Sequence, residues 1–169
     1  MKAVVVYESL FGNTREIAEA VASGLRDHAE VALVSVAQVE EGQLGSADLL
    51  VVGGPTHVHG MTSNLSRKGA LDDAHKKGIP EPALEGTGLR EWLDGLDAGT
   101  GRSAAAFDTR IGKPKLLTGS AAHRIAQRLR RHGYEIVGEE SFIVDDTAGP
   151  LREGERDRAV EWARGLATG

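Results

Sequence analysis

The sequence contains no cysteine. This absence excludes disulfide bonds, cysteine-ligated zinc, iron–sulfur clusters and thiol catalysis. The first residues are charged, then briefly apolar, then polar, and they lack the long apolar core and cleavage site of a secretion signal. Together these features lead us to expect a cytoplasmic protein.

Long apolar runs and an excess of positive charge are also missing. No run approaches the roughly 18 apolar residues of a membrane-spanning helix, so we expect no membrane insertion. Twenty Lys and Arg residues stand against 25 Asp and Glu, a formal net charge of −5, which disfavours general nucleic-acid binding. Aromatic residues make up only 4% of the chain, so few rings are available to stack on a planar ligand.

What the sequence does contain is a regular alternation of apolar runs and helical stripes. Runs of mostly apolar residues predict five buried strands, at residues 3–7, 30–36, 47–55, 103–107 and 135–144. Gly138, inside the fifth run, indicates a β-bulge. Apolar residues with helical spacing predict helices over residues 17–25, 88–96, 119–133 and 153–166.

Strands that alternate with helices favour a parallel sheet covered on both faces. Five strands in 169 residues fit one three-layer, doubly wound α/β domain over residues 1–169. The connection between the third and fourth strands is unusually long, and only residues 88–96 of it have helical spacing. We expect residues 62–87, rich in charge, glycine and proline, to form an insertion on the surface.

In such sheets, ligands bind beyond the carboxyl ends of the strands. The loops at residues 8–14, 55–63 and 108–113 should therefore converge. The first loop leads into a helix, whose unpaired N–H groups and positive dipole end attract anions. It contains hydroxyl and amide donors but neither the lysine of a P-loop nor the G-x-G-x-x-G pattern. A single terminal phosphate suits this loop, although Asn13 followed by Glu16 also fits a simple helix cap.

Two stretches resemble those of a known family. The first, VVYESLFGNTREIAEAVASGL, looks like the opening of flavodoxins and flavodoxin-like FMN proteins, in which a loop rich in Ser and Thr wraps the FMN phosphate. The second, VVGGPTHVHGM, is similar to the family's second loop, which contacts the flavin. The resemblance implies a flavodoxin-like α/β fold with strand order 2-1-3-4-5, FMN as cofactor and electron transfer as function. Redox partner proteins or small-molecule acceptors are the implied partners.

The family's binding residues carry over by position to three loops. The first loop would bind the phosphate, the second would run along the isoalloxazine, and the third would supply the ring's opposite side and pyrimidine edge. The corresponding residues are Ser9, Leu10, Phe11, Gly12, Asn13 and Thr14; Pro55, Thr56, His57, Val58, His59 and Gly60; and Phe107, Asp108, Thr109 and Arg110. The chain departs from the family in lacking the Trp or Tyr that usually stacks on the ring, and in the insertion.

Other interpretations remain open at this point. The chain could be an NAD(P)H-dependent FMN quinone reductase, or a flavodoxin-like module that has lost flavin and serves protein interaction. His57 and His59 form a conceivable metal pair, but no third ligand has a convincing spacing, so we expect no metal site. Residues 110–134 hold seven Lys and Arg and no Asp or Glu, which is typical of a solvated helix face and also suits docking to an acidic partner. No set of side chains identifies a catalytic residue.

Overall fold

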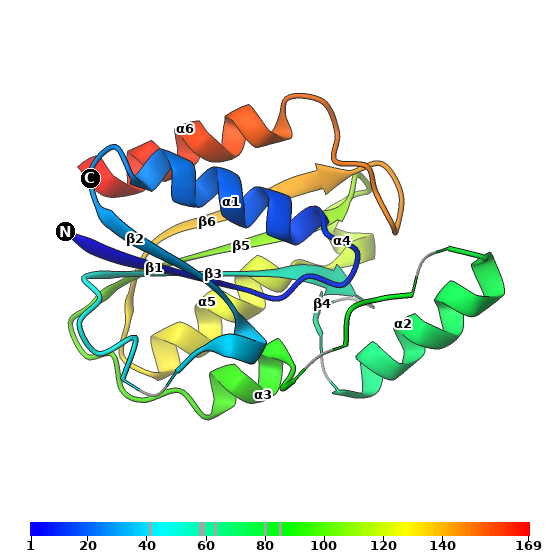
Figure 1. Ribbon diagram of the computed structural model, residues 1–169, viewed down its shortest axis with the longest axis horizontal. Coiled ribbons are helices and arrows are strands. Elements are labelled where there is room, and N and C mark those ends of the chain that lie inside the picture. Colours follow the sequence, from blue (N-terminus) through cyan, green and yellow to red (C-terminus); the bar gives the residue numbers. More distant parts are fainter. Residues whose placement is uncertain (41, 58–59, 63, 80, 85) are drawn as a thin grey trace.

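The computed structural model describes residues 1–40, 42–57, 60–62, 64–79, 81–84 and 86–169. Its sheet has five parallel strands in the order β2-β1-β3-β5-β6 (Figure 1). These strands are β1 (Lys2–Tyr7), β2 (Glu30–Ser35), β3 (Leu49–His57), β5 (Ser103–Ile111) and β6 (Glu135–Val144). The predicted fold and the strand order 2-1-3-4-5 are confirmed. A two-residue strand that was not predicted, β4 (Gly60–Met61), pairs antiparallel with β3.

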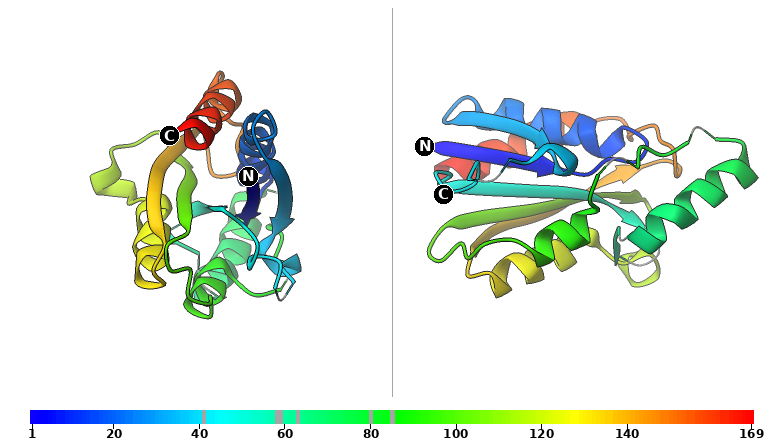
Figure 2. Two further views of the ribbon diagram at one scale, coloured as in Figure 1. Left: turned by 90° about the vertical axis from the view of Figure 1, so that its left-hand side faces the viewer. Right: turned by 60° about the horizontal axis from the view of Figure 1, so that its bottom comes forward.

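Helices cover both faces of the sheet (Figures 1 and 2). On one face lie α1 (Asn13–Leu25) and α6 (Glu155–Thr168), and on the other lie α3 (Leu89–Asp94) and α5 (Ala121–Arg131). A 3₁₀ turn, η1 (Val36–Gln38), follows β2, and the short α4 (Lys115–Thr118) precedes α5. None of the helices in the described ranges is long and apolar enough to cross a membrane.

Alternate residues along each central strand enter opposite cores. In β1, Val4 and Val6 pack toward α3 and α5, whereas Ala3 and Val5 pack toward α1 and α6. The same alternation holds in β3 and in β5. Because successive side chains of a strand point to opposite faces, a strand buried on both faces must be apolar at every position. This explains the continuous apolar runs in the sequence.

The fifth strand contains an irregularity where a bulge was predicted. Ala104 pairs with Ile136 and Ala105 pairs with Gly138, so Val137 is the extra residue of β6. A Cβ on Gly138 would lie 2.7 Å from a methyl carbon of Leu166 in α6. Glycine therefore lets the bulged strand approach the helix closely.

The free edge of β6 is covered near its carboxyl end. The Ile143 N–H donates to Oε2 of Glu155 at 2.6 Å, and the Arg158 guanidinium donates to the Ser141 carbonyl. Both side chains come from α6 and pair with each other at 2.7 Å. They take the place of a neighbouring strand, a recurrent means of blocking an open sheet edge.

The long connection corrects one prediction. Residues 88–96 do contain α3, but a second helix that we did not predict, α2 (Asn64–Lys77), precedes it. This helix lies beyond the carboxyl ends of the strands (Figure 1). Among its side chains whose burial is described, the buried ones are Arg67, Ala70 and Ala74. Two alanines and an arginine do not form the wide apolar stripe by which a surface helix is identified in a sequence.

Candidate functional site

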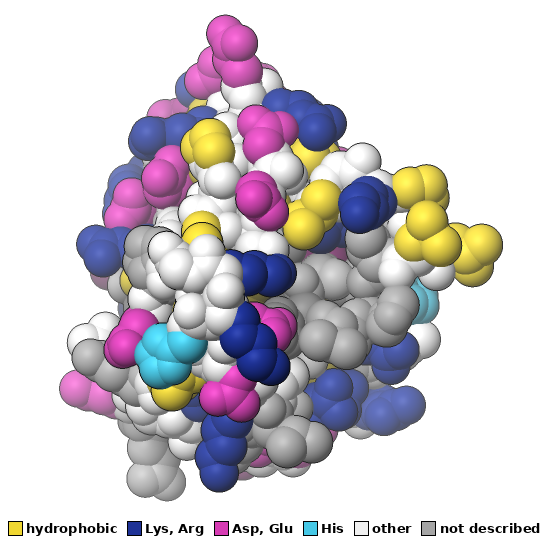
Figure 3. All heavy atoms as spheres, turned by 90° about the vertical axis from the view of Figure 1, so that its right-hand side faces the viewer, with side chains coloured by type: hydrophobic (Ala, Val, Ile, Leu, Met, Phe, Trp, Pro, Cys, Tyr) yellow, Lys and Arg dark blue, Asp and Glu magenta, His cyan; other side chains and the backbone are white. Residues whose placement is uncertain are grey.

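A cavity of about 280 Å³ opens at the carboxyl ends of the strands, where the three predicted loops converge. Figure 3 looks onto this end of the molecule, where apolar, basic and acidic side chains all surround the site. Eight of the sixteen predicted residues line the cavity, and they come from all three loops. They are Leu10, Phe11, Asn13, Thr14, Pro55, Thr56, Thr109 and Arg110.

The amino-terminal end of α1 forms one wall. Gly12 is the N-cap, with a φ of 93°, and no described side chain caps the helix. Asn13 is already the first helical residue, so the alternative in which Asn13 and Glu16 form a capping box is wrong. The Glu16 N–H instead donates to the Gly12 carbonyl at 3.0 Å. The N–H groups of the first turn have no carbonyl partner within the helix, which makes this end suited to an anion.

The left-handed conformation of Gly12 shapes the loop. A Cβ built on Gly12 would meet no atom within 4 Å, so the space beside this residue is open. The Gly12 N–H donates to the Ser9 hydroxyl at 3.0 Å, which closes the loop into a tight turn. Glycine is required here because other residues rarely adopt a positive φ.

A pair of threonines joins the first and third loops. The hydroxyl oxygens of Thr14 and Thr109 lie 2.7 Å apart, and both residues are buried. Only one of the two protons can lie between the oxygens, so the other hydroxyl can donate elsewhere. Since both residues line the cavity, that second proton is available to a ligand.

A buried carboxylate organises the other side of the site. Oδ2 of Asp108 accepts hydrogen bonds from the hydroxyls of Thr56 at 3.0 Å and Ser120 at 2.8 Å, and from the Ala122 N–H at 2.9 Å. Thr56 in turn accepts from the Ala121 N–H at 3.0 Å. Asp108 is completely buried. It therefore binds the first turn of α5 and fixes Thr56 at the cavity wall, and does not itself face the ligand space.

Comparison with known proteins identifies this architecture. Residues 4–67 match the model of a flavodoxin domain family. A flavodoxin from the domain Archaea superposes with a TM-score of 0.68 at 21% identity, covering 99% of this chain and 96% of that one. Flavodoxin 1 from Bacillus cereus gives 0.66 at 19% identity, with coverages of 98% and 97%. A Streptococcus pneumoniae flavodoxin gives 0.68 at 20% identity, with coverages of 99% and 98%. The chain has a flavodoxin-like fold. No curated protein gives a significant sequence match.

The other predicted residues of this flavodoxin-like chain lie elsewhere. Ser9 and Gly12 line a second cavity of about 340 Å³ on the opposite side of the first loop. Phe107 is completely buried and meets the rings of Phe142 and Trp162 edge-on, at 6.2 and 6.3 Å between centroids. Its side chain thus belongs to the core beneath α1 and α6.

The second loop is described only in part. The backbones of His57 and Gly60 pair across the β3–β4 turn, whereas Val58 and His59 lie outside the described residues. Among the residues that are described, no group of three or more His, Cys, Asp or Glu side chains is arranged to hold a metal ion.

The cavity also contains residues that the sequence analysis missed. Asp73 and Lys77 come from α2, and Leu117 comes from α4. Ile111 and Val144 end β5 and β6, and Thr147 follows β6. Leu117 is 62% exposed and its neighbour Leu116 is 94% exposed. No motif marks these residues, because they reach the cavity through an unpredicted helix and short turns. Two consecutive leucines directly after Lys115 were the one visible signal.

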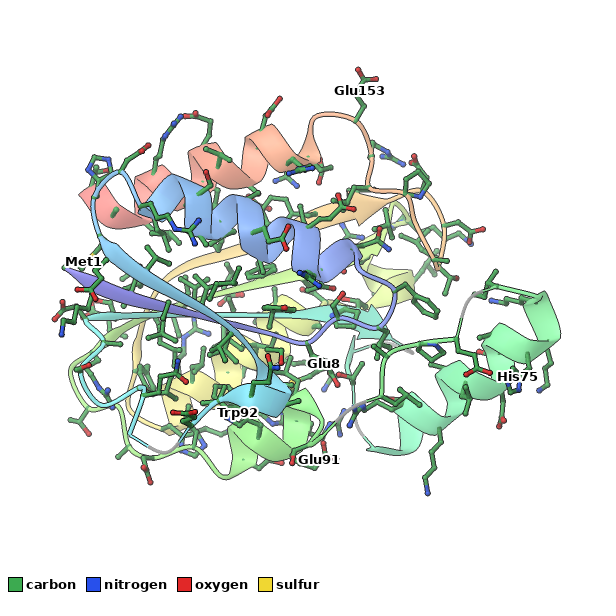
Figure 4. The ribbon with its side chains drawn as sticks, viewed as in Figure 1. Met1, Glu8, His75, Glu91, Trp92 and Glu153 are labelled. Carbon is green, nitrogen blue, oxygen red and sulfur yellow. The ribbon has the colours of Figure 1, made fainter. Side chains whose placement is uncertain are left out.

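A buried ion pair connects the first strand to α2. Nε of Arg67 lies 3.2 Å from Oε1 of Glu8, and both side chains are at least nine-tenths buried. The Thr62 hydroxyl donates to Oε2 of Glu8. Figure 4 shows Glu8 beyond the carboxyl end of β1, where it begins the first loop. Burial raises the pKa of Glu8, although the Thr62 hydrogen bond and the Arg67 charge act in the opposite direction.

Proposed function

We propose that this chain binds FMN and carries electrons in the manner of a flavodoxin. The observation that carries the proposal is the cavity at the uncapped end of α1, lined by Asn13, Thr14, Thr56 and Thr109. Small hydroxyls and main-chain N–H groups at a helix N-terminus are the donors that a phosphate monoester requires. The flavodoxin domain match over residues 4–67 includes this loop.

The residues present fit the cofactor. The cavity of about 280 Å³ is close to the lower size of small-molecule sites, about 300 Å³. Asn13, Thr14 and Thr109 offer neutral hydroxyl and amide donors, which suit a phosphate, and several apolar residues, among them Phe11, Ile111 and Leu117, line the same space. Apolar walls of this kind suit the flat surface of an isoalloxazine.

Each part of the chain would have a distinct task. Asn13 and Thr14 would bind the phosphate through N–H groups, and the Thr14–Thr109 pair would donate a hydroxyl proton. Pro55, Thr56 and residues 57–60 would lie along the ring, with Thr109 and Arg110 on its other side. When bound, FMN would supply one- and two-electron chemistry, while the protein sets its orientation and access to water.

Related structures support the redox assignment. The Bacillus cereus flavodoxin was solved in its oxidised form, and a Megasphaera elsdenii flavodoxin in its two-electron-reduced form. We propose redox proteins or small-molecule acceptors as partners of this chain, and a cytoplasmic location.

Titration of the purified chain with FMN and with riboflavin tests the proposal. Quenching of flavin fluorescence measures both affinities, and a phosphate seat at α1 predicts clearly tighter binding of FMN. Equal affinity for the two flavins, or no binding of FMN, would contradict it. Offering NAD(P)H and quinones to the loaded chain then separates a carrier from a reductase, since only a reductase would oxidise NAD(P)H by itself.

A further inference from the structure

The predicted phosphate loop carries no positive side chain. Residues 8–14 contain one glutamate and no Lys or Arg. Lys77, at the last position of α2, nevertheless lines the same cavity as Asn13 and Thr14. The helix that was not predicted therefore brings a second basic side chain to the cavity, whose other one, Arg110, donates to the Lys113 carbonyl at 2.6 Å.

The position of α2 beside this loop is fixed at several points. Arg67 in its first turns pairs with Glu8, the first residue of the loop, and donates to the Gly86 carbonyl at 2.9 Å. Beyond the helix, the Ala83 N–H donates to the Leu10 carbonyl at 2.9 Å. Ala70 and Ala74 are buried along the helix. These contacts connect α2 to the first loop on both sides of Lys77 in the sequence.

The side chain of Lys77 is exposed at the end of α2. Within the part of the chain that the structure describes, it forms no ion pair. His75, two residues earlier, pairs with Glu81 at 2.9 Å. Asp73, one turn earlier on α2, also lines the cavity. The cavity wall formed by α2 therefore carries one positive and one negative side chain.

We propose that Lys77 is a specificity-determining residue that supplies the positive charge for the phosphate of the ligand. This inference rests on the proposed function, because it assigns a residue to the same site. An ammonium on a flexible stem acts as a point charge toward a dianion. Asp73 acts in the opposite sense and limits the affinity for that anion.

Matched substitutions in α2 test the inference. K77Q and K76Q remove the same charge from adjacent exposed positions at the same helix end, but only Lys77 lines the cavity. Both lose the same favourable interaction with the helix dipole, so that effect cancels. FMN and riboflavin affinities are measured by fluorescence quenching at low and high ionic strength. Circular dichroism of each variant verifies that α2 is retained.

K77Q should weaken FMN binding about tenfold at low salt, the loss expected for one charge-assisted contact, and leave riboflavin binding unchanged. K76Q should change either affinity by less than about twofold. D73N should tighten FMN binding, and the salt dependence of FMN binding should be smaller in K77Q than in the wild type.

The failures of the two ideas are distinguishable. If the wild-type chain does not bind FMN, the proposed function is wrong. If it binds FMN but K77Q and K76Q behave alike, only the role of Lys77 is wrong. If K77Q weakens FMN and riboflavin equally, Lys77 acts on the ring and the assignment to the phosphate is overturned.

Discussion

Glu8 and Arg67 form an ion pair of 3.2 Å in which both side chains are at least nine-tenths buried. The pair joins Glu8, which directly follows β1, to α2, a helix that begins more than fifty positions later in the sequence. Burying two charges costs several kcal/mol each, and their attraction offsets this only when the pair is intact. The wall that α2 adds to the cavity therefore depends on both partners.

R67M should strongly destabilise the chain at pH 7, by about 3–5 kcal/mol, because the Glu8 carboxylate would remain buried without its cation. The measurement is denaturant unfolding followed by circular dichroism. E8Q/R67M removes both charges and should recover most of the loss. Equal stability of the single and double variants would contradict this account of the pair.

The same pair makes a prediction about pH. The pKa of Glu8 is raised above its ordinary value of 4.5, first of all by burial. A carboxyl with a raised pKa contributes stability that is complete below pH 4.5 and is lost as the pH rises through its folded-state pKa. Without Arg67 that pKa rises further, so the deficit of R67M should be largest at neutral pH and smallest near pH 4. A deficit that is independent of pH would assign the loss to packing alone.

Two glycines in helices should respond oppositely to alanine. A Cβ on Gly24 in α1 would lie 2.4 Å from the Val160 carbonyl oxygen of α6, whereas a Cβ on Gly165 in α6 would meet nothing within 4 Å. G24A should cost about 1–3 kcal/mol, because two packed backbones must separate. G165A should stabilise by about 0.5–1 kcal/mol, since alanine is the better helix former. Thermal unfolding measures the stability of both variants. A G24A variant more stable than the wild type would show that α1 and α6 can move apart at little cost.

The threonine pair should matter for stability and for ligand binding. T109V leaves the buried Thr14 hydroxyl without the partner that now lies 2.7 Å away, at a cost of about 1–3 kcal/mol. The same change should weaken FMN more than riboflavin, because the hydroxyl pair lines the cavity in which we propose the phosphate binds. T109S keeps the hydroxyl and serves as the control. If T109V and T109S bind FMN equally well, the pair has no part in binding.

The cover on the edge of β6 should be sensitive to acid. Burial alone would raise the pKa of Glu155, but the Arg158 and Ile143 hydrogen bonds and the charges of Arg158 and Arg152 together lower it. A lowered pKa contributes stability above the ordinary value of 4.5, and this is lost as the pH falls through the folded-state pKa. E155Q should therefore cost about 1–2 kcal/mol at pH 7 and progressively less below pH 4.5.

E153Q is the matched control for that experiment. Glu153 is exposed and points away from the body of the molecule at the turn before α6 (Figure 4). The unfolding free energy of E153Q should equal that of the wild type at every pH. A pH-independent loss in E155Q would show that its charge is not what stabilises the edge.

Features that depend on local pattern were predictable. The doubly buried strands follow from runs such as Val4, Val5 and Val6, since burial on both faces leaves no room for polar residues. The bulge at Gly138 and the helix stripe of α5 were likewise visible. The convergence of the first and third loops, which brings Thr14 to Thr109, follows from the rule that parallel strands end at one edge.

Features that depend on distant partners were not predictable. The position of α2 depends on the ion pair between Arg67 and Glu8 and on the burial of its alanines. No local sequence pattern predicts such a pairing. Phe107 was predicted to end the fourth strand and to contact the flavin, yet β5 extends to Ile111 and the Phe107 ring lies in the core. Lys77 reaches the cavity only through α2 and could not be assigned to it beforehand.

Val137, the extra residue of β6, reverses the face of the sheet to which each later side chain of the strand points. Ile136 before it points toward α5, whereas afterwards Phe142 joins the aromatic rings beneath α6 and Glu139 meets His123 of α5. Without the bulge, Phe142 would point toward the start of α5, which Asp108 binds, and Ser141 would point toward the aromatic rings beneath α6. One extra residue thus lets β6 place Phe142 in the apolar core beneath α6 and a polar residue, Glu139, beside α5.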